Sequence, residues 1–414
     1  MKHIIILISV IGMSIWSAQS QSLSDYYQVA AENNPGLKAS YKAFEASMQR
    51  VSGARSLPDP NFSFGYFISP VETRVGPQIA KFSLTQMFPW FGSLRAQQDA
   101  ASLLADANYQ KFIDQRNHLF FQVASSYYEL YELQKLITLE KENLELLKAY
   151  KQSALTHYEN GNSSMVDVLR ADLLLKDSET NLTILELKHK PLEQQFNRLL
   201  NQPDSVEIVI AYSLSPTVLE SIESDSLLAN NPEIQQLELK RQASEASEIA
   251  ANKQGLPKIG VGLDYMLINE RSDMATSDNG QDAFMPMVTV SLPVFRKKYK
   301  SAKEEARLME ESYSYQKQEV KNQLTTSYDL AQYELKKQEQ LMVLYEHQIH
   351  ETQQSLQLLY SAYSNSGKNF EEVLRMQQQL LKYRKLQLNA LKSNLTAAAK
   401  INLITAKTFV ESTK

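Results

Sequence analysis

Residues 93–161 of this 414-residue chain read SLRAQQDAASLLADANYQKFIDQRNHLFFQVASSYYELYELQKLITLEKENLELLKAYKQSALTHYENG. The stretch holds no proline, and its only glycine is its last residue, Gly161. Four apolar residues within it follow one another at intervals of seven: Val123, Leu130, Ile137 and Leu144. Heptad spacing over such a length predicts a helix that packs along other helices. About 66 helical residues, from 93 to 158, would form a rod of roughly 100 Å.

A second stretch of the same kind occupies residues 294–414, with no proline and one glycine, Gly367. Six residues in it keep the interval of seven: Tyr328, Leu335, Met342, Ile349, Leu356 and Tyr363. Heptads resume after each glycine, from Val168 and from Leu374. Because each glycine lies in the only turn-forming cluster of its stretch, we predict two long helical hairpins with tips near 161 and 367. The whole chain has only 12 Gly and 13 Pro, which excludes collagen and disordered low-complexity chain.

The same landmarks recur in the same order in both halves of the chain. Asn-Asn-Pro opens each half at 33–35 and 230–232, and Leu-Pro follows at 57–58 and 256–257. We therefore predict a duplication. The first repeat covers residues 21–200 with a hairpin at about 93–200. A linker follows at 201–226. The second repeat covers 227–414 with a hairpin at about 296–410.

Between the Leu-Pro pairs and the long stretches, the hydrophobic period changes to two. We predict strands at about 61–69, 79–88, 258–268 and 284–292. In the first, Phe62 and Phe64 alternate with Ser63 and Gly65. Segments of this length suit tilted strands that cross a bilayer, although a small soluble sheet alternates in the same way. Four strands cannot close a transmembrane barrel, so a membrane role would require several chains to share one.

Residues 1–20 have the form of a cleaved secretory signal peptide. A basic start at Lys2 precedes an apolar run, and Ala18-Gln19-Ser20 offers a cleavage site after Ser20. The alternative is an N-terminal anchor helix. The chain contains no cysteine, which excludes disulfides and a lipidated N-terminal cysteine.

No motif of the sequence points to catalysis, so we expect no enzyme. The net charge of −4 and the lack of basic runs give no nucleic-acid surface. His347 and His350 have a spacing that can hold a metal, but solvated histidines are the better explanation, because the order of these residues and Glu351 is not that of a metalloprotease helix. The 12 methionines form no soft-metal ladder along the sequence. We therefore expect neither a metal site nor a cofactor.

Taken together, the landmarks resemble the TolC-type outer-membrane efflux family, the outer membrane factors. The resemblance covers nearly the whole mature chain and includes the tip sequences Gly161-Asn-Ser-Ser-Met-Val-Asp167-Val-Leu and Gly367-Lys-Asn-Phe-Glu-Glu372-Val-Leu. It implies a mainly α fold with a small β part, built from duplicated hairpins and four transmembrane strands per protomer. Three protomers would form a trimeric α-barrel/β-barrel duct that extends from the outer membrane of a bacterial cell into the periplasm.

The resemblance also implies a function and its residues. The protein would be the passive exit duct of a tripartite efflux or type I secretion system, with a periplasmic adaptor and an inner-membrane transporter as partners. Gate candidates by position are Asp167, Glu372, the less certain Glu371, and the arginines Arg170 and Arg375. The turns that would dock the adaptor contain Gly161, Asn162, Ser163, Gly367 and Lys368.

Other readings remain open at this point. The charged tip residues fit an ordinary solvated helix end equally well, and the second tip is one residue shorter than the first. A periplasmic coiled-coil adaptor or structural scaffold would share the hairpins. The sequence does not specify the exported substrate, the class of pump or the resting state of the gate.

Overall fold

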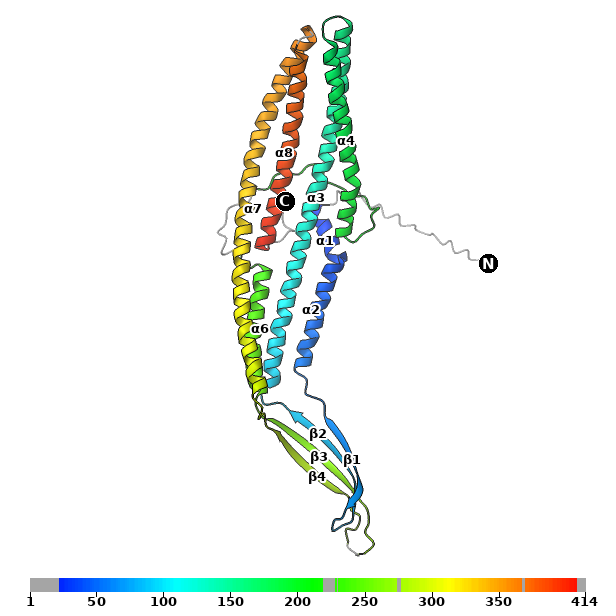
Figure 1. Cartoon of the computed structure of the whole chain (residues 1–414), viewed down its shortest axis with the longest axis vertical. Coiled ribbons are helices and arrows are strands. Elements are labelled where there is room, and N and C mark those ends of the chain that lie inside the picture. The colour runs from blue at the N-terminus through cyan, green and yellow to red at the C-terminus, as the bar shows by residue number, and fades with distance from the viewer. Residues whose placement is uncertain (1–21, 219–227, 229, 274–276, 367–368, 408–414) are drawn as a thin grey trace, which may run out of the picture. The chain divides into compact units, whose positions relative to one another are not determined.

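The computed structural model describes residues 22–218, 228, 230–273, 277–366 and 369–407. The predicted signal peptide, residues 1–20, lies outside this range, as does part of the predicted linker. The first half contains α1 (Leu23–Asn33), α2 (Pro35–Ala54), β1 (Asn61–Val71), β2 (Gln78–Phe88), α3 (Ser93–Glu159) and α4 (Met165–Leu199). The second contains α6 (Pro232–Gln254), β3 (Lys258–Ile268), β4 (Ala283–Ser291), α7 (Lys297–Ser366) and α8 (Phe370–Thr405) (Figure 1).

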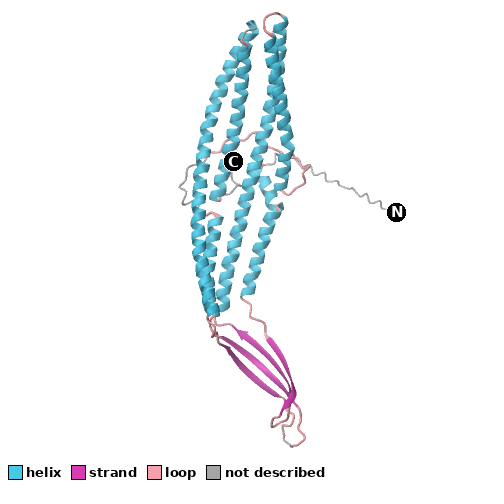
Figure 2. Ribbon diagram, in the orientation of Figure 1, coloured by secondary structure: helices cyan, strands magenta, loops and turns pink. Residues whose placement is uncertain are grey.

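The predicted fold class, mainly helical with a small sheet, is confirmed (Figure 2). Each half ends its opening helical region with a helix of 20 or 23 residues, α2 or α6, and continues through two strands, a helix of 67 or 70 residues and a helix of 35 or 36 residues. The chain divides into two compact units. One comprises Met1–Pro35, Arg116–Ile222 and Ser327–Lys414, and the other comprises Gly36–Gln115 and Glu223–Thr326. The long helices α3 and α7 contribute residues to both units.

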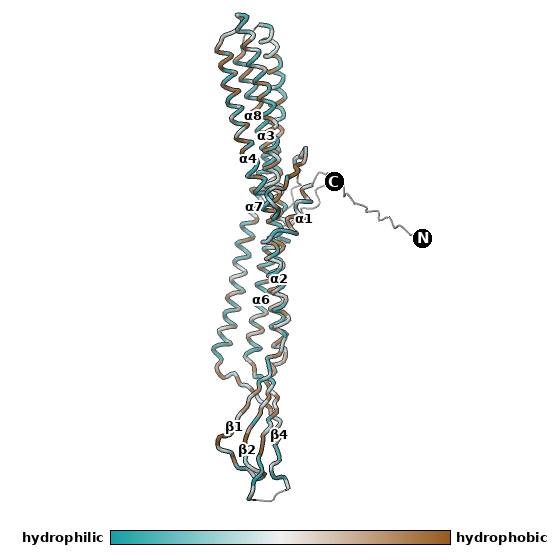
Figure 3. Tube along the Cα trace, turned by 90° about the vertical axis from the view of Figure 1, so that its right-hand side faces the viewer, coloured by the Kyte–Doolittle hydropathy of each residue, from teal (hydrophilic) through white to brown (hydrophobic). Residues whose placement is uncertain are grey.

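The sheet lies in the second unit, and its strands follow the order β1-β2-β3-β4 with every pair antiparallel. The central pair, β2 with β3, joins strands from the two halves of the sequence, for example Phe82 opposite Tyr265. Because side chains alternate along a strand, the register assigns each residue to one of two faces. The strands accordingly carry brown, hydrophobic stretches interrupted by paler positions (Figure 3).

One face of the sheet is a continuous aromatic surface. Rings from four strands contact in sequence, with centroids 5.0 Å apart for Phe64 and Phe82, 6.2 Å for Phe82 and Tyr265, and 4.8 Å for Tyr265 and Phe284. Phe64 and Phe284 are nevertheless 58% and 68% exposed. Large exposed apolar surfaces of this kind mark contact with lipid or with another protein.

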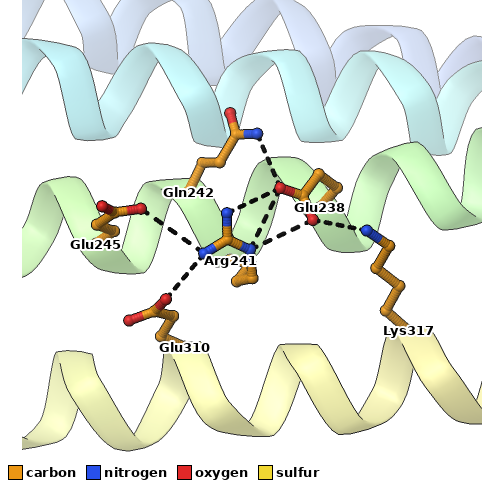
Figure 4. Close-up of polar contacts among 6 residues, drawn as sticks. All are labelled: Glu238, Arg241, Gln242, Glu245, Glu310 and Lys317. Atoms are coloured by element: carbon orange, nitrogen blue, oxygen red, sulfur yellow. Dashed lines mark hydrogen bonds and ion pairs between the residues drawn. The ribbon is translucent and has the colours of Figure 1, made fainter.

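Helices α6 and α7 of the second unit are joined by a cluster of charges (Figure 4). Arg241 of α6 donates to Glu238 at 2.9 Å and to Glu310 of α7 at 2.8 Å, and Lys317 of α7 donates to Glu238 at 2.9 Å. These hydrogen bonds, first of all the one from Arg241, lower the pKa of Glu238 to about 2. The cluster therefore holds the two helices together through an ionised carboxylate.

Tyrosines anchor the linker in the first unit. Tyr127 is 1% exposed, and its hydroxyl accepts a hydrogen bond from the backbone N–H of Ala211 at 2.8 Å. The Tyr26 hydroxyl similarly accepts from the N–H of Val209 at 3.0 Å. The N–H groups of Val209 and Ala211 thus have hydrogen-bond partners, as backbone groups in a packed region require. The backbone path of the linker therefore depends on the two tyrosines.

A chain of buried polar side chains crosses the hairpins of the first unit. Lys385 of α8 meets Oε2 of Glu140 on α3 at 2.5 Å, and Ser178 of α4 donates to Oε1 at 2.8 Å. Asn143 donates to Ser178 at 3.2 Å and accepts from Gln377 at 3.1 Å. The Glu140 side chain is 1% exposed, whereas that of Lys385 is 33% exposed. Polar residues at a helical seam fix the register of the helices.

No helix among the described residues has an apolar stretch long enough to cross a membrane.

Candidate functional site

The first hairpin tip reverses through a glycine with left-handed backbone geometry. Gly161 has φ +72°, its N–H bonds the carbonyl of Tyr158 at 2.9 Å, and the N–H of Asn162 bonds the carbonyl of His157 at 2.8 Å. This pair of bonds is the Schellman motif, which satisfies the last carbonyls of a helix. A residue with a Cβ would be strained at this φ, and this explains why the lone glycine lies here.

Helix α4 begins directly after this turn, with Ser164 as its N-cap. The Ser164 hydroxyl accepts a hydrogen bond from the N–H of Val166 at 3.2 Å. Asp167 follows in the first turn, where the positive end of the helix dipole favours a carboxylate. The local sequence therefore places a negative charge in the first turn of α4, next to the hairpin turn.

In the second tip, α7 ends at Ser366 and α8 begins at Phe370. The predicted docking residues Gly367 and Lys368 lie outside the described residues. Asn369 precedes α8 with φ +66°, a left-handed geometry that asparagine tolerates better than most residues.

A hydrophobic cluster supports both tips and was not predicted from the sequence. Tyr363 and Phe370 are 0% and 1% exposed, and their rings lie 4.7 Å apart. Val168 and Val373, which follow the two carboxylates Asp167 and Glu372, are buried in the same cluster. Tyr363 and Val168 occupy heptad positions, which indicates that they pack against other helices. The sequence does not show that residues from all four long helices meet in one cluster. The cluster fixes the directions in which the charged residues point.

The charged residues meet in an asymmetric arrangement. Arg170 of α4 contacts Glu371 of α8 at 2.8 Å and Asp167 of its own helix at 3.8 Å. Within the described part of the tip, Glu372 forms its ion pair with Arg375 of the same helix, at 3.4 Å. The sequence ranks Glu372 above Glu371, yet Glu371 is the residue that connects the two hairpins. These three carboxylates and two guanidinium groups together carry a net charge of −1.

A polar cavity of about 680 Å³ lies among these residues. It is lined by Asn162, Ser163, Ser164, Asp167, Arg170, Asn369, Phe370, Glu371, Glu372 and Arg375. All five gate candidates therefore border one space, together with Asn162 and Ser163 of the first turn. A cavity with this lining can attract or repel charged groups of a substrate or of a partner protein. Within the described part of the chain, no three His, Asp or Glu residues gather in a way that would hold a metal ion.

The family model for outer membrane efflux protein matches residues 26–202 and 224–407. The chain belongs to this family. It is accordingly an exit duct of efflux systems, and it resides in the outer membrane and extends into the periplasm. The two matched segments correspond to the two halves found in the sequence.

Solved channels share this efflux protein's fold. The outer-membrane channel OprN is 20% identical with a TM-score of 0.71, covering 93% of this chain and 90% of its own. VceC from Vibrio cholerae is 16% identical with a TM-score of 0.74, covering 94% and 96%. The open-state MtrE channel of Neisseria gonorrhoeae is 14% identical with a TM-score of 0.74, covering 92% and 88%. The sequence has no significant match among curated proteins. The family and these relatives are channels, not enzymes.

Proposed function

We propose that this efflux protein works as a homotrimer. The sheet has two edge strands, β1 and β4, and its aromatic face exposes Phe64 and Phe284. Unpaired edges together with an exposed apolar face are unfavourable in water. Three copies joined edge to edge would give twelve strands in a closed barrel, with the aromatic face toward lipid.

We further propose that the helical tips form the gate and that the tip turns dock a periplasmic adaptor. The adaptor would connect the passive duct to an inner-membrane transporter of a tripartite efflux or type I secretion system. The observation that carries the gate is the Arg170–Glu371 contact, because it joins the two hairpins at the tip. Opening the tip requires this contact to break, whereas the Glu372–Arg375 pair lies within one helix and can survive the motion.

The exposure of the two side chains determines how much free energy the Arg170–Glu371 contact contributes to the closed tip. The Arg170 and Glu371 side chains are 44% and 67% exposed, so one contact contributes about 0.5–1 kcal/mol. Three copies in a trimer would hold the tip with about 1.5–3 kcal/mol. The open fraction should therefore rise about 10- to 100-fold when the contact is lost.

Conductance in planar bilayers tests the proposal. We expect Glu371→Gln to raise conductance at low salt, and the matched variant Glu372→Gln to change it less. High salt should reduce the difference because exposed pairs are screened. The two variants behaving alike would remove Glu371 from the gate. The sequence-based gate predicts in addition that D167A with E372A raises conductance, and unchanged conductance would exclude that pair.

Detergent extraction of outer membranes tests the assembly separately. We expect a trimer whose migration in gels changes on heating. A monomer in the soluble periplasmic fraction would refute the trimeric duct and favour a scaffold role.

A further inference from the structure

The face of the sheet opposite the aromatic surface gathers methionines from three strands. The cross-strand register places four of the chain's 12 methionines there: Met87 on β2, Met266 on β3, and Met285 and Met287 on β4. Met87 and Met287 stand opposite Gly260 and Gly262 of the central strand β3. The sequence alone does not predict this group, because its members come from both halves of the chain.

Gly260 creates the space that the Met87 side chain occupies, and Met287 packs beside Gly262. A Cβ on Gly260 would collide with Sδ of Met87, and it would lie 3.3 Å from the Cβ of Thr289. A Cβ on Gly262 would lie 2.9 Å from Oγ1 of Thr85 and 3.0 Å from the carbonyl oxygen of Leu84, and it would be in ordinary van der Waals contact with Cε of Met287 at 3.4 Å. Met87 from β2 and Met287 from β4 therefore lean over β3 from opposite sides. Because Gly260 and Gly262 are two residues apart, these contact points are separated by about 7 Å along the strand.

The sulfur atoms on this face are soft donors, and the hydroxyls of Thr85 and Thr289 lie on the same face. Thioether sulfur selects ions such as Cu(I), whereas Mg²⁺, Ca²⁺ and Mn²⁺ prefer carboxylate and carbonyl oxygen. The carboxylate on the same face, Asp264, is 0% exposed and already paired with Lys81 at 2.5 Å. Met87 and Met287 are half-buried and Met285 is 42% exposed, so sulfur can be reached from this side. Methionine's unbranched side chain also adjusts easily to a ligand.

We propose that this methionine face binds a soft monovalent cation, Cu(I) or its analogue Ag(I), through Met87 and Met287, with Met285 as an adjacent ligand. Binding by a few neutral thioethers without a thiolate allows release as well as capture. The site itself requires only the folded sheet. Its use as a step for exported metal ions rests on the proposed function, in which this face lines the duct.

Silver titration of the purified full-length protein in detergent tests the site. The chain contains no cysteine, so no thiolate competes for Ag(I). We compare the wild type with M87L/M287L, since exchange of methionine for leucine conserves volume. The matched control is M48L/M309L, because Met48 and Met309 are 44% and 39% exposed on α2 and α7.

The expected result is Ag(I) binding by the wild type and the control, and its loss in M87L/M287L. Silver should also slow peroxide oxidation of Met87 and Met287, but not of Met48, in peptide mass spectra. Equal binding by wild type and M87L/M287L, or no protection, would overturn the site. Heat-modifiable migration is recorded on the same samples. Binding without a trimer would refute the duct alone, and a trimer without binding would refute the site alone.

Discussion

The buried Glu140–Lys385 pair predicts an unequal cost for removing its two members. Lys385→Met leaves the Glu140 carboxylate charged and 1% exposed, with Oε2 deprived of its cation. Leaving a buried charge uncompensated costs about 3–5 kcal/mol. Glu140→Gln leaves an isosteric neutral group, and Lys385, already 33% exposed, can turn toward water. Losing such a charged hydrogen bond costs about 1.5–3 kcal/mol.

Urea titrations followed by far-ultraviolet circular dichroism measure these costs. We expect K385M to be less stable than E140Q by about 1.5–2 kcal/mol. The double variant should be more stable than K385M alone, because it no longer buries a charge. Lys148→Met removes an exposed pair with Glu145 and should change stability by less than about 0.5 kcal/mol. If E140Q costs as much as K385M, the carboxylate is not the buried charge that the geometry indicates.

Three further predictions concern other parts of the fold. Glu238→Gln should lower the thermal unfolding midpoint at neutral pH. Because the pKa of Glu238 is lowered to about 2, its contribution is full above the ordinary carboxyl pKa and disappears as the pH falls toward 2, so wild type and variant should converge in acid melting scans. Gly161→Ala should lower the free energy of unfolding by about 1 kcal/mol because alanine is strained at a φ of +72°. Gly53→Ala should raise the free energy of unfolding by a similar amount, because Gly53 lies in helix α2 with free space around its Cα. Amide hydrogen exchange should therefore become faster in the first segment and slower in the second. Lys81→Met should leave the buried Asp264 carboxylate without its cation and lower the heating temperature at which the oligomer dissociates, and an unchanged temperature would contradict the pairing.

The periodic parts of the chain were predictable because local sequence determines them. Helix α3 begins at Ser93, where the helical pattern begins, and ends two residues before Gly161. Strand β3 covers the residues Lys258–Ile268 that alternate in the sequence. In each case a run of residues with one period and clear turn formers defines the element.

Contacts between distant segments were not predictable in this way. The pairings of β2 and of β4 with β3 together decide that Met87 and Met287 lean over the same strand, and no single-strand pattern contains that information. The same applies to Glu140 and Lys385, which are 245 positions apart in the numbering but in contact across α3 and α8. Heptads predict that both helices pack but do not specify the register between them.

The tips show how a one-residue difference breaks the symmetry of the two halves. Alignment on Val168 and Val373 makes Asp167 equivalent to Glu372 and Arg170 equivalent to Arg375, and both pairs form the same contact within their helices. The residue before the aligned carboxylate is Val166 in the first tip and Glu371 in the second. Only Glu371 can therefore reach across, to Arg170, and the first tip has no acidic counterpart for Arg375. The two hairpins are consequently joined by Arg170 of α4 and Glu371 of α8, whereas Arg375 pairs within its own helix. Substitution of Arg170 should therefore raise the conductance of the duct more than substitution of Arg375.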